Sequence, residues 1–339
     1  MLNPKLKLNP KIFNADCEQV PTRKGFGQGM TQAAESNKNI VGLSADLSES
    51  TGMSPFTEKF PDRFVQVGVA EQNLVTVASG LAAMGKIPFC SSFAIFSPGR
   101  NWEQIRTTIA YNDRKVVIVG SHAGLSDGPD GGTHQALEDI GLMRMLPNME
   151  VVNPCDALEA KRAAIALSKT KKPSYLRVGR VNVPIITTEE TPFEVGKAEI
   201  YWLPDVGLAQ VGIIVTGVLT SAAIFAAKEL ENPQAGGEGI KVKVMNLSSI
   251  KPIDKDAIIA LAKETKKVVT VEEHQIAGGM GSAVAEVLAQ NFPVAMEFVG
   301  VKDQFGQTGQ PEELMKHYGI DKNAIKEAVK RIILRKQIT

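Results

Sequence analysis

Features that mark several other protein classes are absent from this sequence. Its 339 residues include only three cysteines, Cys17, Cys90 and Cys155, which stand far apart without CxxC spacing, so neither a disulfide framework nor a zinc site is predicted. No apolar stretch is long enough to span a bilayer, and residues 1–7 lack the apolar segment of a signal peptide. A formal net charge of +1, without any Lys- and Arg-rich run, gives no nucleic-acid footprint. We therefore expect a soluble protein of the reducing cytoplasm with no membrane or nucleic-acid partner.

The common nucleotide and hydrolase motifs are missing as well. No Walker loop, HExxH or GxSxG string occurs in the chain. Residues 279–284 follow a predicted strand and open a predicted helix, but Val284 stands where a dinucleotide fingerprint needs its third glycine. Close packing of the helix on the strand explains these glycines better, and nicotinamide binding is not predicted.

What the chain does contain is an alternation of strand-like and helix-like segments. Residues 1–16 are rich in Lys, Asn and Pro and predict an extended arm, whereas residues 185–207 are rich in Thr, Glu and Pro and mark a boundary. On each side of this boundary the alternation predicts an α/β domain, 17–190 and 205–339, each a mostly parallel sheet flanked by helices. The predicted strands are 40–44, 64–69, 115–119, 150–152, 211–215, 242–245, 267–271 and 294–299. The predicted helices are 23–34, 74–82, 102–110, 135–145, 156–167, 221–230, 255–262, 282–288 and 322–334, and 232–239 is a predicted surface turn.

The stretch GVAEQN at 68–73 places a carboxylate where a strand turns into a helix. The run 64–69 is largely apolar and β-branched, and apolar residues recur at helical spacing from Leu74 onwards. Glu71 is therefore predicted at the carboxyl end of a strand, where ligands bind in open α/β sheets. The alternative is a glutamate that only complements the helix dipole. The surrounding motifs favour the ligand-binding role.

Those motifs resemble the pyrimidine-binding domain of transketolase and its thiamine-diphosphate relatives. The resemblance is carried by GVAEQN at 68–73, SFAIF at 92–96 and HAGLSDGPDGGTHQ at 122–135. It continues through PNM at 147–149 and PCD at 154–156 to Arg180, and more weakly into a C-terminal domain of the same family. It implies that 17–190 is the pyrimidine-binding domain and that 205–339 is the transketolase C-terminal domain.

The resemblance implies thiamine diphosphate as the cofactor. Glu71 matches the catalytic glutamate that hydrogen-bonds the aminopyrimidine ring, so that this ring can act as the base that activates the cofactor. Phe93 and Phe96 match the aromatic pocket for that ring, although core packing is an ordinary alternative for two phenylalanines. Asp46 matches a residue that reaches the cofactor from the neighbouring active-site half. The chain departs from the family at 98–100, where PGR replaces a frequent tyrosine.

Six residues match positions that contact a phosphorylated sugar in transketolase: Arg23, Ser50, His122, Asp130, His134 and Arg180. The resemblance implies that Arg23 and Arg180 grip the terminal phosphate through forked, charge-assisted hydrogen bonds. His122 and the Ser50 hydroxyl would assist them. Asp130 and His134 would contact hydroxyls nearer the reacting carbon, and His134 would move a proton as a second catalytic residue. Taken singly, each is explained by a solvated surface or a satisfied histidine; together, in the family's order, they favour a substrate site.

The family's diphosphate and metal motifs are not found in this chain. It has no Gly-Asp-Gly and no Asn-Asn, which in the family lie on a separate domain that precedes the pyrimidine-binding one. The resemblance therefore implies the C-terminal subunit of a split transketolase, which moves a two-carbon ketol unit from a ketose phosphate to an aldose phosphate. An N-terminal partner subunit would hold Mg²⁺ or another divalent metal, no metal ligand is assigned here, and a heterotetramer of two plus two subunits is expected.

Three alternatives stay open. Deoxyxylulose-phosphate synthase shares two of the motifs but usually has arginine where His122 stands. The β subunit of a 2-oxoacid dehydrogenase is split in the same way but lacks the DGxTHQ block. A non-catalytic scaffold that kept the fold is the third, and the intact residues Glu71, Phe93, Phe96 and His134 argue against it.

Overall fold

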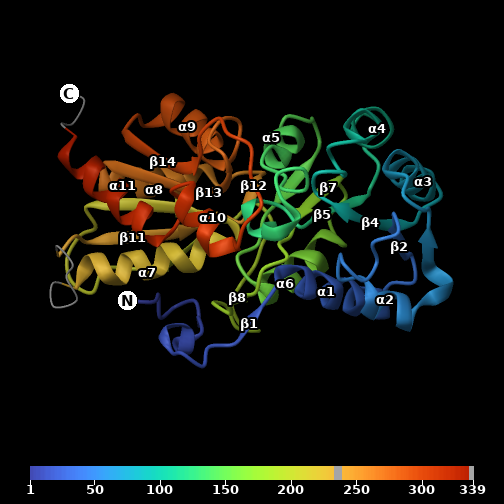
Figure 1. Cartoon of the computed structure of the whole chain (residues 1–339), viewed down its shortest axis with the longest axis horizontal. Helices are drawn as coiled ribbons and strands as arrows, with labels where there is room; N and C mark the ends of the chain where they lie inside the picture. Colours follow the sequence, from blue (N-terminus) through green and yellow to red (C-terminus); the bar gives the residue numbers. More distant parts are fainter. Residues whose placement is uncertain (233–238, 336–339) are drawn as a thin grey trace.

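The computed structural model describes residues 1–232 and 239–335 and consists of two α/β lobes lying side by side (Figure 1). The first lobe is built on a seven-stranded sheet with the order β12-β6-β7-β5-β4-β2-β3. Its strands are β2 (Ile40–Ser44), β3 (Phe64–Gln66), β4 (Ile87–Phe93), β5 (Val117–Ser121), β6 (Glu150–Val152), β7 (Ser174–Arg177) and β12 (Ser249–Lys251). All neighbours are parallel except β12, which comes from the second half of the chain and pairs antiparallel with β6. The second half of the chain thus completes the edge of the first sheet.

Helices cover both faces of this sheet, as parallel strands require. On one face lie α1 (Thr22–Ser36), α2 (Ser54–Lys59) and α6 (Ala157–Leu167). On the other lie α3 (Glu71–Ala83), α4 (Trp102–Gln104), which continues as a π-helix (Ile105–Ala110), and α5 (Asp139–Arg144). α1 packs against α6 so closely that a Cβ on Gly25 would lie 1.8 Å from the Ala157 carbonyl oxygen and one on Gly29 would lie 2.3 Å from that of Lys161, which explains these two glycines.

The second lobe contains a five-stranded sheet with the order β14-β13-β10-β11-β9. Its strands are β9 (Glu199–Trp202), β10 (Val211–Val215), β11 (Val242–Asn246), β13 (Lys267–Gln275) and β14 (Ala295–Val301), and only β9 runs antiparallel to its neighbour. One face is covered by α7 (Thr220–Glu231) and α11 (Lys322–Leu334), the other by α8 (Lys255–Thr265) and α9 (Met280–Asn291), and α10 (Pro311–His317) lies against the first lobe. One hydrophobic core joins α3 and α5 of the first lobe to α8 and α9 of the second, so the lobes are packed together.

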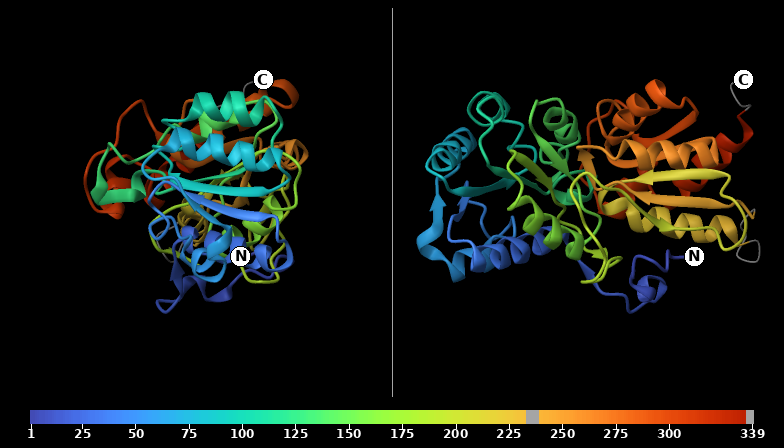
Figure 2. Two further views of the ribbon diagram at one scale, coloured as in Figure 1. Left: turned by 90° about the vertical axis from the view of Figure 1, so that its right-hand side faces the viewer. Right: turned by 180° about the vertical axis from the view of Figure 1, so that it is seen from behind.

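The N-terminal arm lies along the second lobe of its own chain (Figure 2). Leu6, Leu8 and Ile12 are buried in the core under α7 and α11, and the arm includes a short 3₁₀ helix (Pro10–Phe13). After the arm, β1 (Gln19–Val20) pairs with β8 (Val183–Pro184). The arm therefore contributes to the stability of the chain itself.

The predicted fold class, two consecutive α/β units with mostly parallel sheets, is confirmed. The predicted helix 135–145 is wrong at its start: α5 begins only at Asp139, because the Gln135 side chain binds other backbone groups and Ala136 bridges to Ala123. The predicted strand 64–69 ends at Gln66, since Gly68 has a φ of +74° that a strand cannot accommodate. Most of the predicted turn 232–239 lies outside the described residues. Among the helices that the structure describes, none combines the length and apolar character of a membrane span.

Candidate active site

Glu71 is the first residue of α3 and its side chain is only 1% exposed. The Ser92 hydroxyl donates to Oε1 at 3.3 Å, and Arg100 Nη1 lies 3.0 Å from Oε2. The Asn101 side chain fixes the same residue from behind by donating to its carbonyl oxygen at 2.8 Å. The turn at Gly68 and the end of β4 thus hold one carboxylate rigidly at the carboxyl edge of the sheet.

Two phenyl rings lie next to this carboxylate. Phe93 ends β4 and Phe96 follows in the next turn, with ring centroids 6.2 Å apart and planes inclined by 13°. The His122 ring stacks on Phe93 at 3.9 Å, and His134 meets Phe96 edge-on at 5.4 Å. The half-exposed Arg100 guanidinium lies 5.1 Å from the centre of the Phe96 ring. Flat aromatic faces beside a buried carboxylate suit a nitrogen heterocycle.

His122, Arg23 and Ser50 form a second group on the same side of the lobe. Arg23 Nη1 lies 3.2 Å from His122 Nε2 and donates to the Ser50 carbonyl oxygen at 2.5 Å. Burial, reinforced by the neighbouring Arg23 and Arg180, lowers the pKa of His122 to about 3, so its imidazole is neutral at physiological pH. Arg23 and Ser50 also line an adjacent pocket of about 460 Å³, together with Lys24. Two cationic residues and one acidic residue, Glu49, line this pocket, so cationic side chains are available there for an anionic group.

Arg180 is paired with acidic side chains from the 3₁₀ segment Leu125–Asp130. Its Nη1 lies 3.0 Å from an Asp130 carboxylate oxygen and 3.5 Å from one of Asp127. Burial and the nearby Asp130 raise the pKa of Asp127 to about 7. The positive charge of Arg180 is therefore shared with two carboxyl groups before any anion binds.

Nearly all the predicted site residues gather at this edge. Arg23 and Arg180 are close enough to lower the pKa of His122, and Asp130 and His134 also act on His122. Asp46 is different: it is exposed, at the end of β2, with a φ of +63°. Its backbone N–H donates to the Gln66 side-chain oxygen at 2.7 Å.

Sequence reasoning missed Ser92, Arg100, Asn101 and Asp127. Two of them belong to motifs that carry the family resemblance: Ser92 is the first residue of SFAIF, and Asp127 lies in the motif at 122–135. Arg100 belongs to the string PGR at 98–100, where the sequence departs from the family pattern. That departure was the signal that this side of the pocket differs from the family's pocket.

The residues present fit the aromatic part of a thiamine cofactor: a buried carboxylate with hydroxyl and guanidinium partners lies beside two nearly parallel phenyl rings. In the part of the chain that the structure describes, no group of three or more His, Cys, Asp or Glu side chains is placed to hold a metal ion.

This fold and site define a class of thiamine-dependent enzymes, and the comparisons with known proteins agree. Residues 18–185 match the family model "Transketolase, pyrimidine binding domain", and residues 201–325 match "Transketolase, C-terminal domain". The chain belongs to the transketolase family.

Individual relatives are similar over almost their whole lengths. A Methanocaldococcus jannaschii protein, provisionally named a transketolase C-terminal section, is 41% identical over 91% of this chain and 94% of its own. The 6-deoxy-6-sulfo-D-fructose transketolase subunit SqwH of Clostridium sp. (strain MSTE9) is 36% identical over 96% of this chain and 98% of its own. A solved structure of a split gene transketolase, an inactive β4 tetramer, superposes with a TM-score of 0.84 at 40% identity and covers 93% of this chain and 98% of that one.

Proposed function

We propose that this chain is the C-terminal subunit of a split transketolase and supplies the pyrimidine half of a thiamine-diphosphate site. The single observation that carries the proposal is the buried Glu71 carboxylate, held by Ser92 and Arg100 beside the rings of Phe93 and Phe96. The proposed division of the chain is an arm (1–16), a pyrimidine-binding domain (17–190) and a C-terminal domain (205–339). The three cysteines are free, as in a reducing compartment, and we extend the proposal to the cytoplasm.

When bound, thiamine diphosphate supplies the carbon nucleophile that cleaves and reforms carbon–carbon bonds. Glu71 hydrogen-bonds the pyrimidine nitrogen and holds or releases a proton there, while Phe93 and Phe96 stack on the ring and keep water from it. The proposed role of Asp46 is to reach the cofactor across an assembly interface, and its exposure in this chain is compatible with that role.

The same edge of the sheet binds the sugar. Arg23, Arg180 and the Ser50 hydroxyl hold the terminal anion in this proposal, and Lys24 lines the pocket of Arg23 and Ser50. The neutral His122 acts as a hydrogen-bonding partner. His134 lies against Phe96 and Asp130 is paired with Arg180, and in this proposal both contact hydroxyls near the reacting carbon. We propose a ketose phosphate donor and an aldose phosphate acceptor; the relative named for a sulfo-sugar shares the need for a terminal anion.

Replacing Arg180 tests the anion site. Hydrogen bonds to charged groups contribute about 1.5–3 kcal/mol, so Arg180→Ala should lower kcat/KM for ribose 5-phosphate by roughly ten- to a hundredfold. Ribose, which has no phosphate, should be affected much less, and the exposed Arg114→Ala is the matched control. Equal losses on both acceptors would make Arg180 a structural residue.

The diphosphate and the divalent metal, Mg²⁺ in the simplest case, are proposed to lie on an N-terminal partner subunit in a heterotetramer of two plus two. The support is that relatives covered over 98% of their length are named as a subunit and as a split gene product, and that the latter was inactive as a β4 tetramer. The test is to mix this chain with the N-terminal transketolase subunit from the same organism and to follow two-carbon transfer from fructose 6-phosphate to ribose 5-phosphate. Turnover should require both chains, and a mixture that forms a complex but transfers nothing would contradict the assignment.

A further inference from the structure

The segment 124–135, which contains Asp130 and His134, is held by the second lobe. The Ser126 backbone N–H donates to Glu273 Oε1, and the Ser126 hydroxyl donates to Glu273 Oε2 at 3.2 Å. Glu273 lies on β13 and is buried. A Cβ on Gly124, whose φ is +90°, would lie 2.3 Å from the Glu273 carboxyl carbon, so the chain is pressed directly onto this side chain.

A second contact involves the chain that follows β14. The Gln135 amide donates to the Gln307 carbonyl oxygen at 3.0 Å and to the Gly128 carbonyl oxygen at 3.1 Å. A Cβ on Gly132 would lie 2.3 Å from the Gly306 carbonyl oxygen, which shows how closely the two backbones approach. The segment 124–135 is thus enclosed between β13 and residues 306–309.

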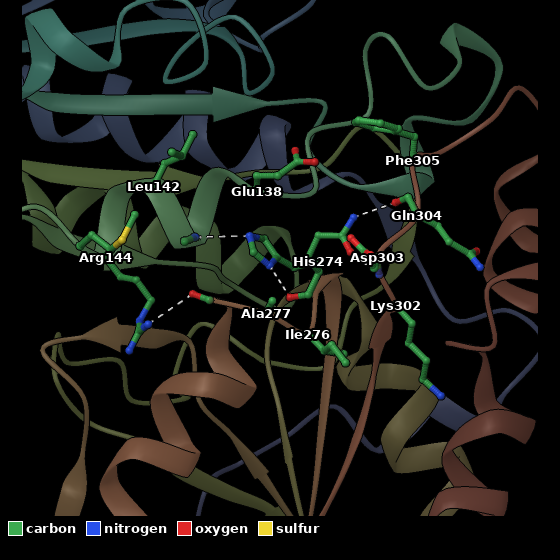
Figure 3. A pocket seen from close by; sticks show the side chains of 14 residues that line it. Glu138, Leu142, Arg144, His274, Ile276, Ala277, Lys302, Asp303, Gln304 and Phe305 are labelled. Atoms are coloured by element: carbon green, nitrogen blue, oxygen red, sulfur yellow. Dashed lines mark hydrogen bonds between the residues drawn. The ribbon is translucent and has the colours of Figure 1, made fainter.

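The end of β13 also holds this second segment in place. The Gln275 side chain donates to the Gln304 carbonyl oxygen at 2.7 Å and accepts from the Asp303 N–H at 3.0 Å. These residues, with His274 and Phe305, line a pocket of about 680 Å³ between the lobes (Figure 3). β13 therefore contacts both segments: Glu273 binds Ser126 in 124–135, and Gln275 binds Gln304 in the chain after β14.

Glu273 also interacts electrostatically with the first lobe. Burial raises the pKa of Glu273 to about 7, while the nearby Arg177 opposes the rise. Arg177 itself donates to the Glu273 carbonyl oxygen at 3.0 Å. Glu273 is therefore a buried acid whose hydrogen bonds and neighbouring charge both come from the other lobe.

We infer that Glu273 is a positioning residue for the sugar site: through Ser126 it fixes the segment that presents Asp130 and His134, although it touches no substrate itself. The C-terminal domain then has a defined part in the reaction, which is to set the geometry of a substrate-contacting segment. The link to the sugar rests on the proposed function, whereas the restraint of 124–135 does not.

Glu272 offers a matched control. It is the preceding residue of β13, it is buried, and burial raises its pKa to about 7 as well. Its carboxylate accepts from the Met280 N–H at 2.6 Å and from the Gly281 N–H at 2.8 Å, so it caps α9 within its own lobe. Glu272→Gln perturbs the strand as much as Glu273→Gln but not the segment 124–135.

The first experiment is amide hydrogen exchange on the full chain at about pH 8, where both carboxyl groups are largely ionised. Glu273→Gln replaces charge-assisted hydrogen bonds by neutral ones and should speed exchange in 124–135 by about fivefold or more. Glu272→Gln should speed exchange at the start of α9 and leave 124–135 unchanged. If Glu273→Gln does not fold, Ser126→Ala removes the hydroxyl contact from the other side and should also speed exchange there. Unchanged exchange in 124–135 in the folded variants, or equal changes in both glutamate variants, would overturn the inference.

The second experiment separates this inference from the proposed function. In the mixture with the N-terminal subunit, Glu273→Gln should raise KM for ribose 5-phosphate by about fivefold and change the Kd for thiamine diphosphate much less, because Glu71 and its partners Ser92 and Arg100 lie outside 124–135. A faster-exchanging segment with an unchanged KM would disprove a role in substrate positioning. Faster exchange in a mixture that never transfers a two-carbon unit would instead count against the proposed function and leave the restraint of 124–135 established.

Discussion

Replacing Glu71 by glutamine is expected to lower turnover of the assembled enzyme by about 10²–10⁴-fold, the range in which general acid–base groups contribute. Glutamine keeps the size of the side chain; its one carbonyl oxygen can still accept from Arg100, and its amide NH2 can donate to the Ser92 hydroxyl oxygen. It cannot hold and release a proton at the pyrimidine nitrogen. Folding should change little, because the buried cavity stays filled and the Asn101 contact to the backbone is untouched.

The control for this change is Glu103→Gln, an exposed glutamate in the first turn of α4. Both variants are compared by steady-state turnover in the presence of the N-terminal subunit and by their far-ultraviolet circular dichroism. If Glu71→Gln kept most of the wild-type turnover, the catalytic assignment of Glu71 would be wrong.

The second large effect concerns stability. Asp139 on α5 and Arg177 on β7 form an ion pair of 2.8 Å with both side chains buried, and the Tyr175 hydroxyl donates to the same Asp139 oxygen at 2.7 Å. Asp139→Asn would leave the guanidinium buried without its nearest counter-ion. Because breaking a buried pair from one side costs about 3–5 kcal/mol, we expect a loss of that size in the free energy of unfolding, measured in urea.

A surface pair provides the comparison. Lys172 and Asp113 are 2.7 Å apart but about half exposed, so Asp113→Asn should change the free energy of unfolding by less than about 1 kcal/mol. Similar small losses for both variants would contradict the structural role given to the buried pair.

The pH dependence of the Asp139 effect has a defined sign. Burial alone would raise the pKa of Asp139, but the Arg177 guanidinium holds it below its usual range. A lowered folded-state pKa gives stability that is present above the pKa in the unfolded chain, about 3.9, and is lost as the pH falls through the folded value. The difference between wild type and Asp139→Asn should therefore be constant near neutral pH and shrink below about pH 4.

Local sequence patterns predicted the fold class because it depends on short-range signals, whereas the candidate site residues came from motifs that resemble those of transketolase. β-branched runs and helical periodicity identify parallel strands and their covering helices, and strand ends lie at one edge of the sheet whatever the details of packing. Glu71, Phe93 and His122 each follow or end a strand, which is why motifs scattered through the sequence converge there.

What the sequence did not predict depends on contacts between distant residues. β12 is a three-residue strand whose partner, β6, lies about a hundred positions earlier, so no local pattern marks it. Ser126 and Glu273 are 147 positions apart, and their contact follows from how the lobes pack. The same packing keeps Gln135 out of α5, which a helical pattern alone cannot foresee.

The central claim is that this chain provides only the pyrimidine half of the cofactor site and that a second polypeptide provides the rest. Calorimetric titration of thiamine diphosphate with Mg²⁺ tests it most directly, first into this chain alone and then into its mixture with the N-terminal transketolase subunit. The account predicts weak or no binding to the isolated chain and tight, metal-dependent binding to the mixture. Tight, magnesium-dependent binding by this chain alone would contradict it.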